Sequence, residues 1–186
     1  RLRVVQQERV AARYDRFVIL THEEKPLWKG FSNLRVIPNA LPFSPQKRAD
    51  VSAKHLIAVG RMEYQKNFPE LVDIWALIAK DYPDWKLRIV GDGYVDVRIL
   101  QRVKEHGLEA QFELCPSTPH IQKHYLSASI FALSSVFEGL PLVTIEAESM
   151  GLPLVSYACP CGPRDVIRNG QDGFLVEPGD KETFAA

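Results

Sequence analysis

The sequence lacks most features of a secreted, membrane-spanning or nucleic-acid-binding protein. Three cysteines in 186 residues are too few for a disulfide framework, which favours a reducing compartment. No signal-peptide pattern, apolar run of membrane-spanning length or Asn-x-Ser/Thr sequon occurs. The 23 basic residues are matched by 23 acidic ones, so the basic excess of a nucleic-acid binder is absent. These absences favour a cytoplasmic protein without a nucleic-acid partner.

Two familiar nucleotide motifs are also missing or incomplete. No Walker P-loop occurs anywhere in the sequence. Gly91 and Gly93 follow a predicted strand, but Asp96 stands where a dinucleotide fingerprint has its third glycine. This pattern alone is a weak signal, and it disfavours an NAD-dependent dehydrogenase.

The residues that could bind a metal do not complete a site. Cys159 and Cys161 are one residue apart, but Cys115 is distant in sequence and no matching Cys/His pair completes a zinc site. His120 and His124 share a predicted helix face without the glutamate that a zincin needs between them. We therefore expect no metal, and structural or incidental cysteines.

The composition is that of an ordinary globular protein, with 46% hydrophobic and 25% charged residues. The length suits one or two domains with a full core. The charge is unevenly distributed, because residues 1–50 hold 10 Lys/Arg and 5 Asp/Glu whereas the remainder holds 13 and 18. Such asymmetry indicates two parts with different environments.

The first part of the chain predicts short elements followed by a linker. Apolar spacing predicts a helix over residues 1–13 and extended segments over 16–21 and 34–38. Thr21 and the acidic pair that follows His22 predict the start of a helix over residues 22–31. Prolines and polar residues then indicate a linker over residues 39–52.

Beyond the linker, apolar strands alternate with amphipathic helices. The strands are expected over residues 55–60, 85–90, 111–114, 129–133, 152–156 and 173–176. The helices are expected over residues 67–82, 94–106, 121–126, 141–150 and 163–168, with a last one capped by Asp180. This alternation predicts an α/β fold, a doubly wound, Rossmann-like parallel sheet. Its ligand is expected at the carboxyl ends of the strands, near the topological switch point.

Two loops at those strand ends carry residues suited to a nucleotide. After the first strand, Gly60 permits close backbone approach, and Arg61 and Lys66 place cations beside a helix start, as a diphosphate requires. The alternative is two solvated surface charges. After the fourth strand come Glu138 and, eight residues later, Glu146.

A carboxylate can accept hydrogen bonds from two vicinal hydroxyls, which suits a ribose or a hexose. Backbone N–H groups over residues 139–143 would hold an anion in the same crevice. The alternative places Glu138 in a turn and Glu146 on a solvated helix face. Apolar neighbours of Glu146 argue against that, and Glu148 fits the exposed face better.

Taken together, these motifs resemble the C-terminal half of a retaining, family 4 glycosyltransferase with the GT-B fold. The resemblance runs from about Asn39 to Ala186. Its specific element is Glu138-x7-Glu146, and it is supported by the Gly60 and Gly91 loops and the segment from Gly173 to Asp180. Residues 1–38 resemble the end of the N-terminal, acceptor domain, residues 39–52 the interdomain linker, and residues 53–186 the donor domain with a truncated last helix.

The resemblance implies a role for each matching residue. Arg61 and Lys66 would bind the donor diphosphate, Glu146 the ribose and Glu138 the transferred sugar. The loop near Leu114 and Cys115 would flank the base, although the family often has glycine where Cys115 stands. The implied donor-binding residues are Gly60, Arg61, Lys66, Gly91, Gly93, Leu114, Cys115, Glu138, Gly139, Leu140, Pro141, Leu142 and Glu146. Those implied in catalysis are Glu138, Arg61 and Lys66.

The resemblance also implies a UDP-sugar donor, no metal, and transfer of a hexose or N-acetylhexosamine with retention. The acceptor would be a sugar or a lipid-linked sugar in bacterial surface polysaccharide or lipopolysaccharide synthesis. The parent enzyme would be peripheral at the inner face of the cytoplasmic membrane, and this fragment alone would be inactive. Alternatives that stay open are a UDP-sugar 2-epimerase of the same fold and a non-catalytic nucleotide-binding module.

Overall fold

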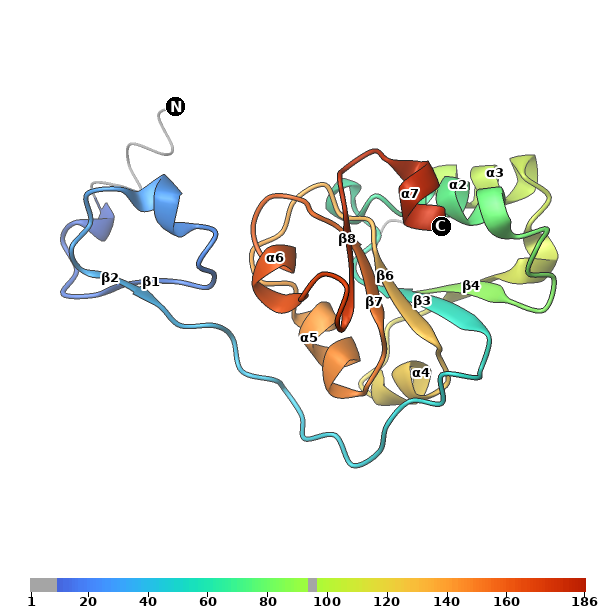
Figure 1. Ribbon diagram of the computed structural model, residues 1–186, viewed down its shortest axis with the longest axis horizontal. Helices are drawn as coiled ribbons and strands as arrows, with labels where there is room; N and C mark the ends of the chain where they lie inside the picture. Colours follow the sequence, from blue (N-terminus) through green and yellow to red (C-terminus); the bar gives the residue numbers. More distant parts are fainter. Residues whose placement is uncertain (1–9, 94–96) are drawn as a thin grey trace.

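Six short apolar strands pair into one parallel sheet in the order β5-β4-β3-β6-β7-β8 (Figure 1). The computed structural model describes residues 10–93 and 97–186. The strands are β3 (His55–Val59), β4 (Lys86–Val90), β5 (Phe112–Cys115), β6 (Ile130–Leu133), β7 (Leu154–Tyr157) and β8 (Gly173–Val176). The strand order reverses between β3 and β6, so the topological switch point lies between these two strands.

Helices cover both faces of this sheet. They are α2 (Phe68–Ile78), α3 (Val97–Glu105), α4 (Gln122–Leu126), α5 (Leu142–Ser149), α6 (Pro163–Val166) and α7 (Lys181–Ala185), with single 3-10 turns at Tyr64–Lys66 and Glu109–Gln111. Side chains alternate along β3 because successive residues of a strand point to opposite faces. Leu56 and Ala58 belong to the core beneath α2, α3 and α7, whereas Ile57 and Val59 belong to the core beneath α4 and α5. The predicted doubly wound α/β fold is confirmed.

In the sheet domain, the expected element boundaries are close to those observed, except at the end of α2 and the start of α3. The helix α2 ends at Ile78 instead of residue 82, and the chain continues in a turn in which the Asp81 amide donates to Ile78 O at 3.0 Å. The helix expected from residue 94 is described from Val97, since residues 94–96, with Asp96, lie outside the described residues. Asp180 caps α7 as predicted, accepting a hydrogen bond from the Thr183 amide at 3.0 Å.

Residues 10–38, here called the N-terminal unit, form a separate small body (Figure 1). Its strands β1 (Phe17–Ile19) and β2 (Leu34–Val36) are parallel, and most of the helix expected over residues 1–13 lies outside the described residues. The helix expected over residues 22–31 is wrong, since a single 3-10 turn, η1 (Lys25–Trp28), forms. Pro26 provides no N–H for a helix, and Thr21 donates to Glu24 Oε2 at 3.1 Å instead of capping.

Residues 39–52, the linker, are all described and form no helix or strand. Their far end is fixed to the sheet domain, because the Ala49 amide donates to Met150 O at 2.8 Å and the Asp50 amide to Leu126 O at 3.2 Å. Phe43 packs against the core of that domain. Among the described residues, no helix is long and apolar enough to cross a membrane.

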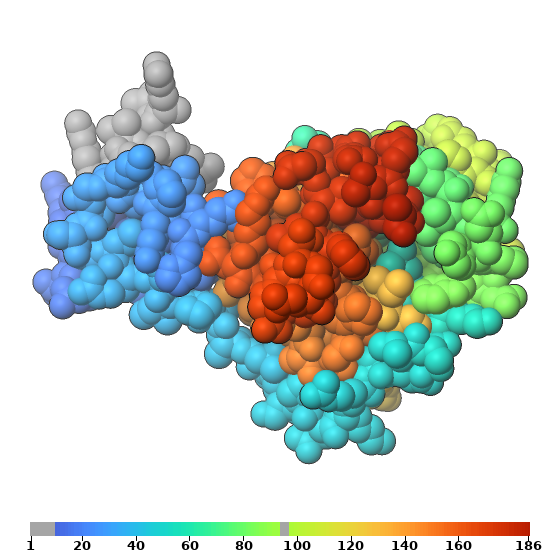
Figure 2. Space-filling model, viewed as in Figure 1, coloured from blue at the N-terminus to red at the C-terminus, as the bar shows by residue number. Residues whose placement is uncertain are grey.

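The N-terminal unit contacts the sheet domain through α6 (Figure 2). The Asp165 carboxylate accepts hydrogen bonds from the His22 amide at 2.8 Å and the Glu23 amide at 3.0 Å. Arg164 adds an ion pair to Glu23 at 3.3 Å. Two consecutive residues of one short helix therefore dock the turn that follows β1.

Three helices on one face are joined by a single carboxylate. Asp73 of α2 lies 2.5 Å from Arg102 of α3 and 3.0 Å from both His106 and Lys181, the latter at the start of α7. Burial alone would raise the pKa of Asp73, but hydrogen bonds from these three side chains lower it overall. Asp73 therefore stays ionised and connects three elements that are distant in sequence.

Replacing Asp73 by Asn should lower the free energy of unfolding by about 2 kcal/mol at pH 7, because hydrogen bonds to a charged group are lost. The lowered pKa means that this stabilisation is present above the ordinary carboxyl pKa and is lost as the pH falls through the folded value. Urea unfolding at pH 7 and in acid would measure both effects. The exposed Asp81→Asn is the control, and an equal loss there would contradict the role of Asp73.

Candidate functional site

A buried ion pair spans the switch point between β3 and β6. Lys66, at the end of the turn that follows β3, places Nζ 2.8 Å from Oε1 of Glu138, in the loop that follows β6. The two side chains are only 13% and 7% exposed. Paired burial is required because either charge alone would be poorly solvated there. The two residues that the sequence assigned to different parts of a ligand thus contact each other.

Neighbouring polar groups fix the orientation of the Glu138 carboxylate. Ser135 donates to Oε1 at 2.7 Å, and Gln65 Nε2 donates to Oε2 at 3.2 Å. The Glu138 amide donates to the carbonyl of Pro160 at 3.0 Å. A carboxylate held in this way keeps one direction, as a group that recognises a ligand must. Ser135 and Gln65 were not predicted, since neither belongs to a recognisable pattern.

The backbones of the two loops are also joined. The Val136 amide donates to Gln65 O at 2.8 Å. Ser134 Oγ donates to Lys66 O at 2.9 Å, and Gln65 Nε2 donates to Phe137 O at 3.0 Å. The loops therefore move as one piece, although 72 residues separate Lys66 from Glu138.

The predicted glycines are explained by close contacts. A Cβ on Gly91 would lie 1.8 Å from Gly60 O, and one on Gly60 would lie 2.6 Å from Lys66 Cε. Gly93 allows an approach to the Met62 amide, 3.1 Å from where a Cβ would be. Glycine at these positions lets the loops after β3 and β4 touch, and the Lys66 stem crosses directly over Gly60.

Arg61 lies in the same loop as Lys66 but in a different environment. Its side chain is 75% exposed and pairs with Glu63 at 3.2 Å. The two cations expected to converge therefore differ, since one is buried and paired and the other extends into solvent.

The first turn of α5 presents amide groups at the same edge of the sheet. In the part of the chain that the structure describes, the amides of Leu142 and Val143 have no hydrogen-bond acceptor, as is usual for the first turn of a helix. Pro141 has no N–H, so the predicted run of backbone donors over residues 139–143 is interrupted there. Leu140 is buried, and Gly162 packs so closely on Gly139 that a Cβ would lie 2.2 Å from its carbonyl oxygen.

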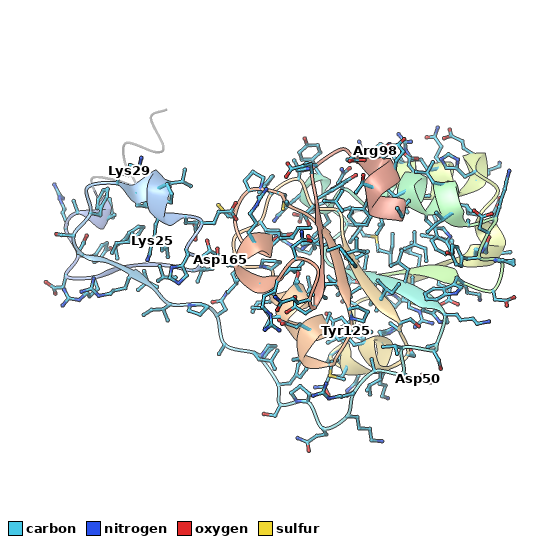
Figure 3. The ribbon with its side chains drawn as sticks, viewed as in Figure 1. Lys25, Lys29, Asp50, Arg98, Tyr125 and Asp165 are labelled. Carbon is cyan, nitrogen blue, oxygen red and sulfur yellow. The ribbon has the colours of Figure 1, made fainter. Side chains whose placement is uncertain are left out.

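Glu146 is neither a solvated helix residue nor free. It is half-buried, and the hydroxyl of Tyr125 donates to its Oε2 at 2.8 Å. Burial, and then the charge of Glu146, raise the pKa of Tyr125 far above its ordinary value, so the hydroxyl stays a donor. Tyr125 lies on α4, between that helix and α5 (Figure 3). The sequence analysis missed Tyr125 because nothing in the sequence links it to Glu146, which lies 21 residues further along the chain.

Leu114 and Cys115 are the last two residues of strand β5. Cys115 pairs there with Val90 of β4. Cys115 is half-buried, and burial raises the pKa of its thiol. The loop begins after it, at Pro116, and is tied to the loop after β4 because Asp92 accepts hydrogen bonds from the Ser117 amide and hydroxyl. The loop near Leu114 and Cys115 therefore begins directly after β5, at the carboxyl end of the strand.

The remaining candidates have structural settings. Burial, and then the charges of Glu138 and Glu23, raise the pKa of Cys159 to about 12, so its thiol is not reactive. Within residues 10–93 and 97–186, no group of three or more His, Cys, Asp or Glu could hold a metal ion. Glu148 is half-buried instead of exposed, and burial followed by the charge of Asp172 raises its pKa.

Glu148 lines a cavity of about 370 Å³ between the N-terminal unit and α5 and α6. Its walls are formed by Leu20, His22, Val36, Pro38, Leu140, Ile145, Glu148, Asp165 and Val166. Leu140 connects this cavity to the loop of Glu138. Lys66 and Glu138 are not among the residues that line this cavity.

Comparisons with known proteins agree with this geometry. Residues 42–186 match the family model described as glycosyl transferases group 1. The chain is 37% identical over 182 residues to the amylovoran biosynthesis glycosyltransferase AmsD of Erwinia amylovora, covering 92% of this chain and 51% of that protein. It is 32% identical to the lipopolysaccharide 1,6-galactosyltransferase of Salmonella typhimurium, covering 68% and 36%. The chain thus spans about half the length of the first of these relatives.

The fold is also found among solved structures. The chain superposes with a TM-score of 0.85 on a mutant of S. aureus TarM solved in complex with Fondaparinux, alpha-GlcNAc-glycerol and UDP. The two are 24% identical, and the match covers 94% of this chain and 36% of that one. At this identity the likeness establishes the fold.

A double-mutant cycle over Lys66→Met and Glu138→Gln should give a coupling free energy of about 2–3 kcal/mol, because either single change leaves a buried charge or acceptor unpaired. Urea unfolding of the four proteins would measure it. The same cycle on Lys54 and Asp84, a pair at 3.1 Å with side chains 53% and 74% exposed, should give less than about 1 kcal/mol. Equal coupling in both pairs would contradict the importance of burial.

Proposed function

The chain belongs to the glycosyl transferases group 1 family and has the sheet of the GT-B fold, and on that premise we propose that it binds a UDP-sugar donor. The observation that carries the proposal is the Lys66–Glu138 pair at the switch point, 2.8 Å apart and beside the free amides of α5. A cation, helix amides and an oriented carboxylate at one strand edge suit a diphosphate joined to a polyol.

Each site residue has a proposed part in donor binding. Lys66 and Arg61 bind the diphosphate together with the amides of Leu142 and Val143. Glu146, oriented by Tyr125 at 2.8 Å, accepts hydrogen bonds from the ribose hydroxyls. Glu138 accepts hydrogen bonds from the sugar to be transferred. Gly60, Gly91 and Gly93 keep the backbone close to the ligand, with Leu114, Cys115, Gly139, Leu140 and Pro141 around it.

Lys66 can serve both ligand parts because an ammonium group donates three hydrogen bonds. One is used by Glu138 in the structure, and two remain for phosphate oxygens. In this proposal Lys66 Nζ contacts both the phosphates and the Glu138 carboxylate that binds the sugar. The pair therefore fixes the position of the sugar relative to the diphosphate. Arg61, which is exposed, closes on the phosphates from solvent.

The reaction we propose is transfer with retention. Departure of UDP places negative charge on the diphosphate, and fixed cations and amides stabilise that charge without a metal. As the bond from the sugar carbon to the UDP oxygen breaks, the acceptor hydroxyl attacks the same face of the oxocarbenium-like sugar and gives its proton to the departing diphosphate, and neither Glu138 nor Glu146 acts as a nucleophile. In this proposal Glu138 accepts hydrogen bonds from the sugar, and Glu146 accepts them from the ribose hydroxyls.

The acceptor is proposed to bind mainly on the half that precedes the linker. In this proposal, residues 1–38 belong to the acceptor domain, residues 39–52 are the linker and residues 53–186 are the donor domain. Relatives named for amylovoran and lipopolysaccharide support a sugar or lipid-linked acceptor in surface polysaccharide synthesis. A parent enzyme that acts on such an acceptor would work in the cytoplasm at the inner membrane face and transfer a hexose or N-acetylhexosamine.

A donor-binding module without transfer is the second candidate for this chain. The observation in its favour is that the chain covers 51% of AmsD, while the acceptor half of the proposed enzyme lies mostly outside that match. We therefore expect the chain to bind UDP but not to catalyse transfer. Robust turnover by this chain alone would contradict that expectation.

Calorimetric titration should show UDP binding to the chain, with Glu146→Ala weakening it by about tenfold because a charged hydrogen-bond acceptor is lost. Glu138→Ala should leave UDP binding within about twofold and weaken an intact UDP-sugar by about tenfold. UDP-glucose, UDP-galactose, UDP-GlcNAc and UDP-GalNAc are the probes. Glu105→Ala, on the exposed surface of α3, is the control.

Absence of UDP binding by the unmodified chain would contradict the donor site. Equal losses for UDP and UDP-sugars in both variants would contradict the division of roles between Glu138 and Glu146. A screen of the four nucleotide sugars against the full-length parent enzyme would identify the sugar that is transferred.

A further inference from the structure

Asn67, the residue after Lys66, has an uncommon backbone conformation. It joins the 3-10 turn that ends at Lys66 to the first residue of α2. Its φ of 50° lies in the left-handed region, which side chains other than glycine rarely adopt and asparagine tolerates better than most. Ser134 Oγ, directly after β6, lies 2.9 Å from Lys66 O and 3.3 Å from Asn67 O. The direction in which Lys66 leaves α2 therefore depends on the conformation of Asn67.

The side chain of Asn67 is held by Glu70. Asn67 Nδ2 donates to Glu70 Oε2 at 2.5 Å, three residues further along in the first turn of α2. The other oxygen, Oε1, accepts a hydrogen bond from the hydroxyl of Tyr157 at 2.8 Å, although 87 residues separate the two in the sequence. One half-buried carboxylate thus uses both of its oxygens to connect Asn67 with Tyr157.

Tyr157 is a fixed anchor for this carboxylate. It is the last residue of β7 and is only 2% exposed. Its ring packs edge-on against Phe184 of α7, with the ring centroids 4.9 Å apart, and α7 lies beside α2 (Figure 1). Burial, and then the hydrogen bond to Glu70, raise the pKa of Tyr157 far above its ordinary value, so the hydroxyl stays a donor at neutral pH. Glu70 is therefore attached to the core of the sheet domain.

The end of β7 is connected to both members of the buried pair. The loop that follows Tyr157 accepts the Glu138 amide at Pro160 O, at 3.0 Å. Tyr157 itself holds Glu70, which holds the residue next to Lys66. The lysine and the carboxylate at the switch point are thus positioned from the same strand, one through its hydroxyl contact and the other through its loop.

We propose that Glu70 is a positioning residue for Lys66: bound to Tyr157, it holds Asn67 in the left-handed conformation that directs the Lys66 ammonium group at the donor diphosphate. This inference rests on the proposed donor site. Glu70 does not bind the ligand itself, since both of its oxygens are used within the protein. Its contribution therefore belongs to the affinity for the diphosphate and not to the affinity for the nucleoside.

The test is titration of the full chain with UDP and with uridine, followed by NMR so that millimolar dissociation constants can be measured. Glu70→Gln should weaken UDP binding by about fivefold, because an amide accepts from one of the two donors and turns its own N–H groups toward the other. Uridine, which has no phosphate, should stay within about twofold. Tyr157→Phe, which keeps the ring in place, should weaken UDP by about threefold and leave uridine unchanged.

An Asn67→Gly background separates positioning from a general effect on α2. Glycine adopts positive φ without strain and has no side chain for Glu70 to hold. Glu70→Gln should therefore cost less than about twofold in UDP affinity in that background, whereas a loss of charge at the helix start would cost the same in both. The matched control is Glu105→Gln, which changes an acceptor of Gln101 Nε2 at 2.7 Å on α3 and should leave UDP and uridine binding unchanged.

The outcomes separate the two proposals. If the chain binds UDP but Glu70→Gln leaves that affinity unchanged, weakens uridine equally, or costs the same in both backgrounds, Glu70 does not position Lys66 and the donor site stands. Urea unfolding of each variant gives its folded fraction at the temperature of the titration, so that a loss through unfolding is corrected for. If the unmodified chain binds no UDP at all, the donor site itself is wrong, and this inference is wrong with it.

Discussion

The buried pair of Lys66 and Glu138 is the interaction on which the site depends. Where the strand order of a parallel sheet reverses, the loops after the two central strands, here β3 and β6, run in opposite directions. Only a direct contact between these loops holds them together. The pair supplies that contact at 2.8 Å, and backbone hydrogen bonds beside it join the same loops. Breaking the pair would leave a buried charge without its partner, so electrostatics as well as packing hold the two loops together.

A series of contacts connects this pair to the N-terminal unit. Residues 158–162 contact the loop of Glu138 through Pro160 and Gly162. The helix that follows, α6, binds the turn of the N-terminal unit through Asp165. A displacement of the N-terminal unit would therefore also displace the loop that orients Glu138. The geometry at the switch point is therefore coupled to the position of the N-terminal unit relative to the sheet domain.

The fold could be predicted from the sequence because its signals are local. Apolar runs bounded by glycine and proline marked the strands, and Asp180 was recognisable as a cap. The pairing of Lys66 with Glu138 could not be predicted, since charge and spacing do not reveal which side chains are dry. Tyr125 is a buried core residue. Its hydroxyl contributes to the site only by donating to Glu146, a contact that the sequence does not reveal. The short turn at residues 25–28 replaced a predicted helix because Pro26 outweighed the acidic start.

The linker sets how strong the contacts of α6 need to be. Among the described residues, no backbone hydrogen bond ties residues 38–48 to either half, while Ala49 is already fixed to the sheet domain at 2.8 Å. A tether of this length keeps the N-terminal unit at an effective concentration of roughly millimolar beside α6. At such an effective concentration, contacts with a dissociation constant of about a millimolar would hold the N-terminal unit on α6 about half of the time, so the few bonds of Asp165 and Arg164 do not need to be strong to keep it there.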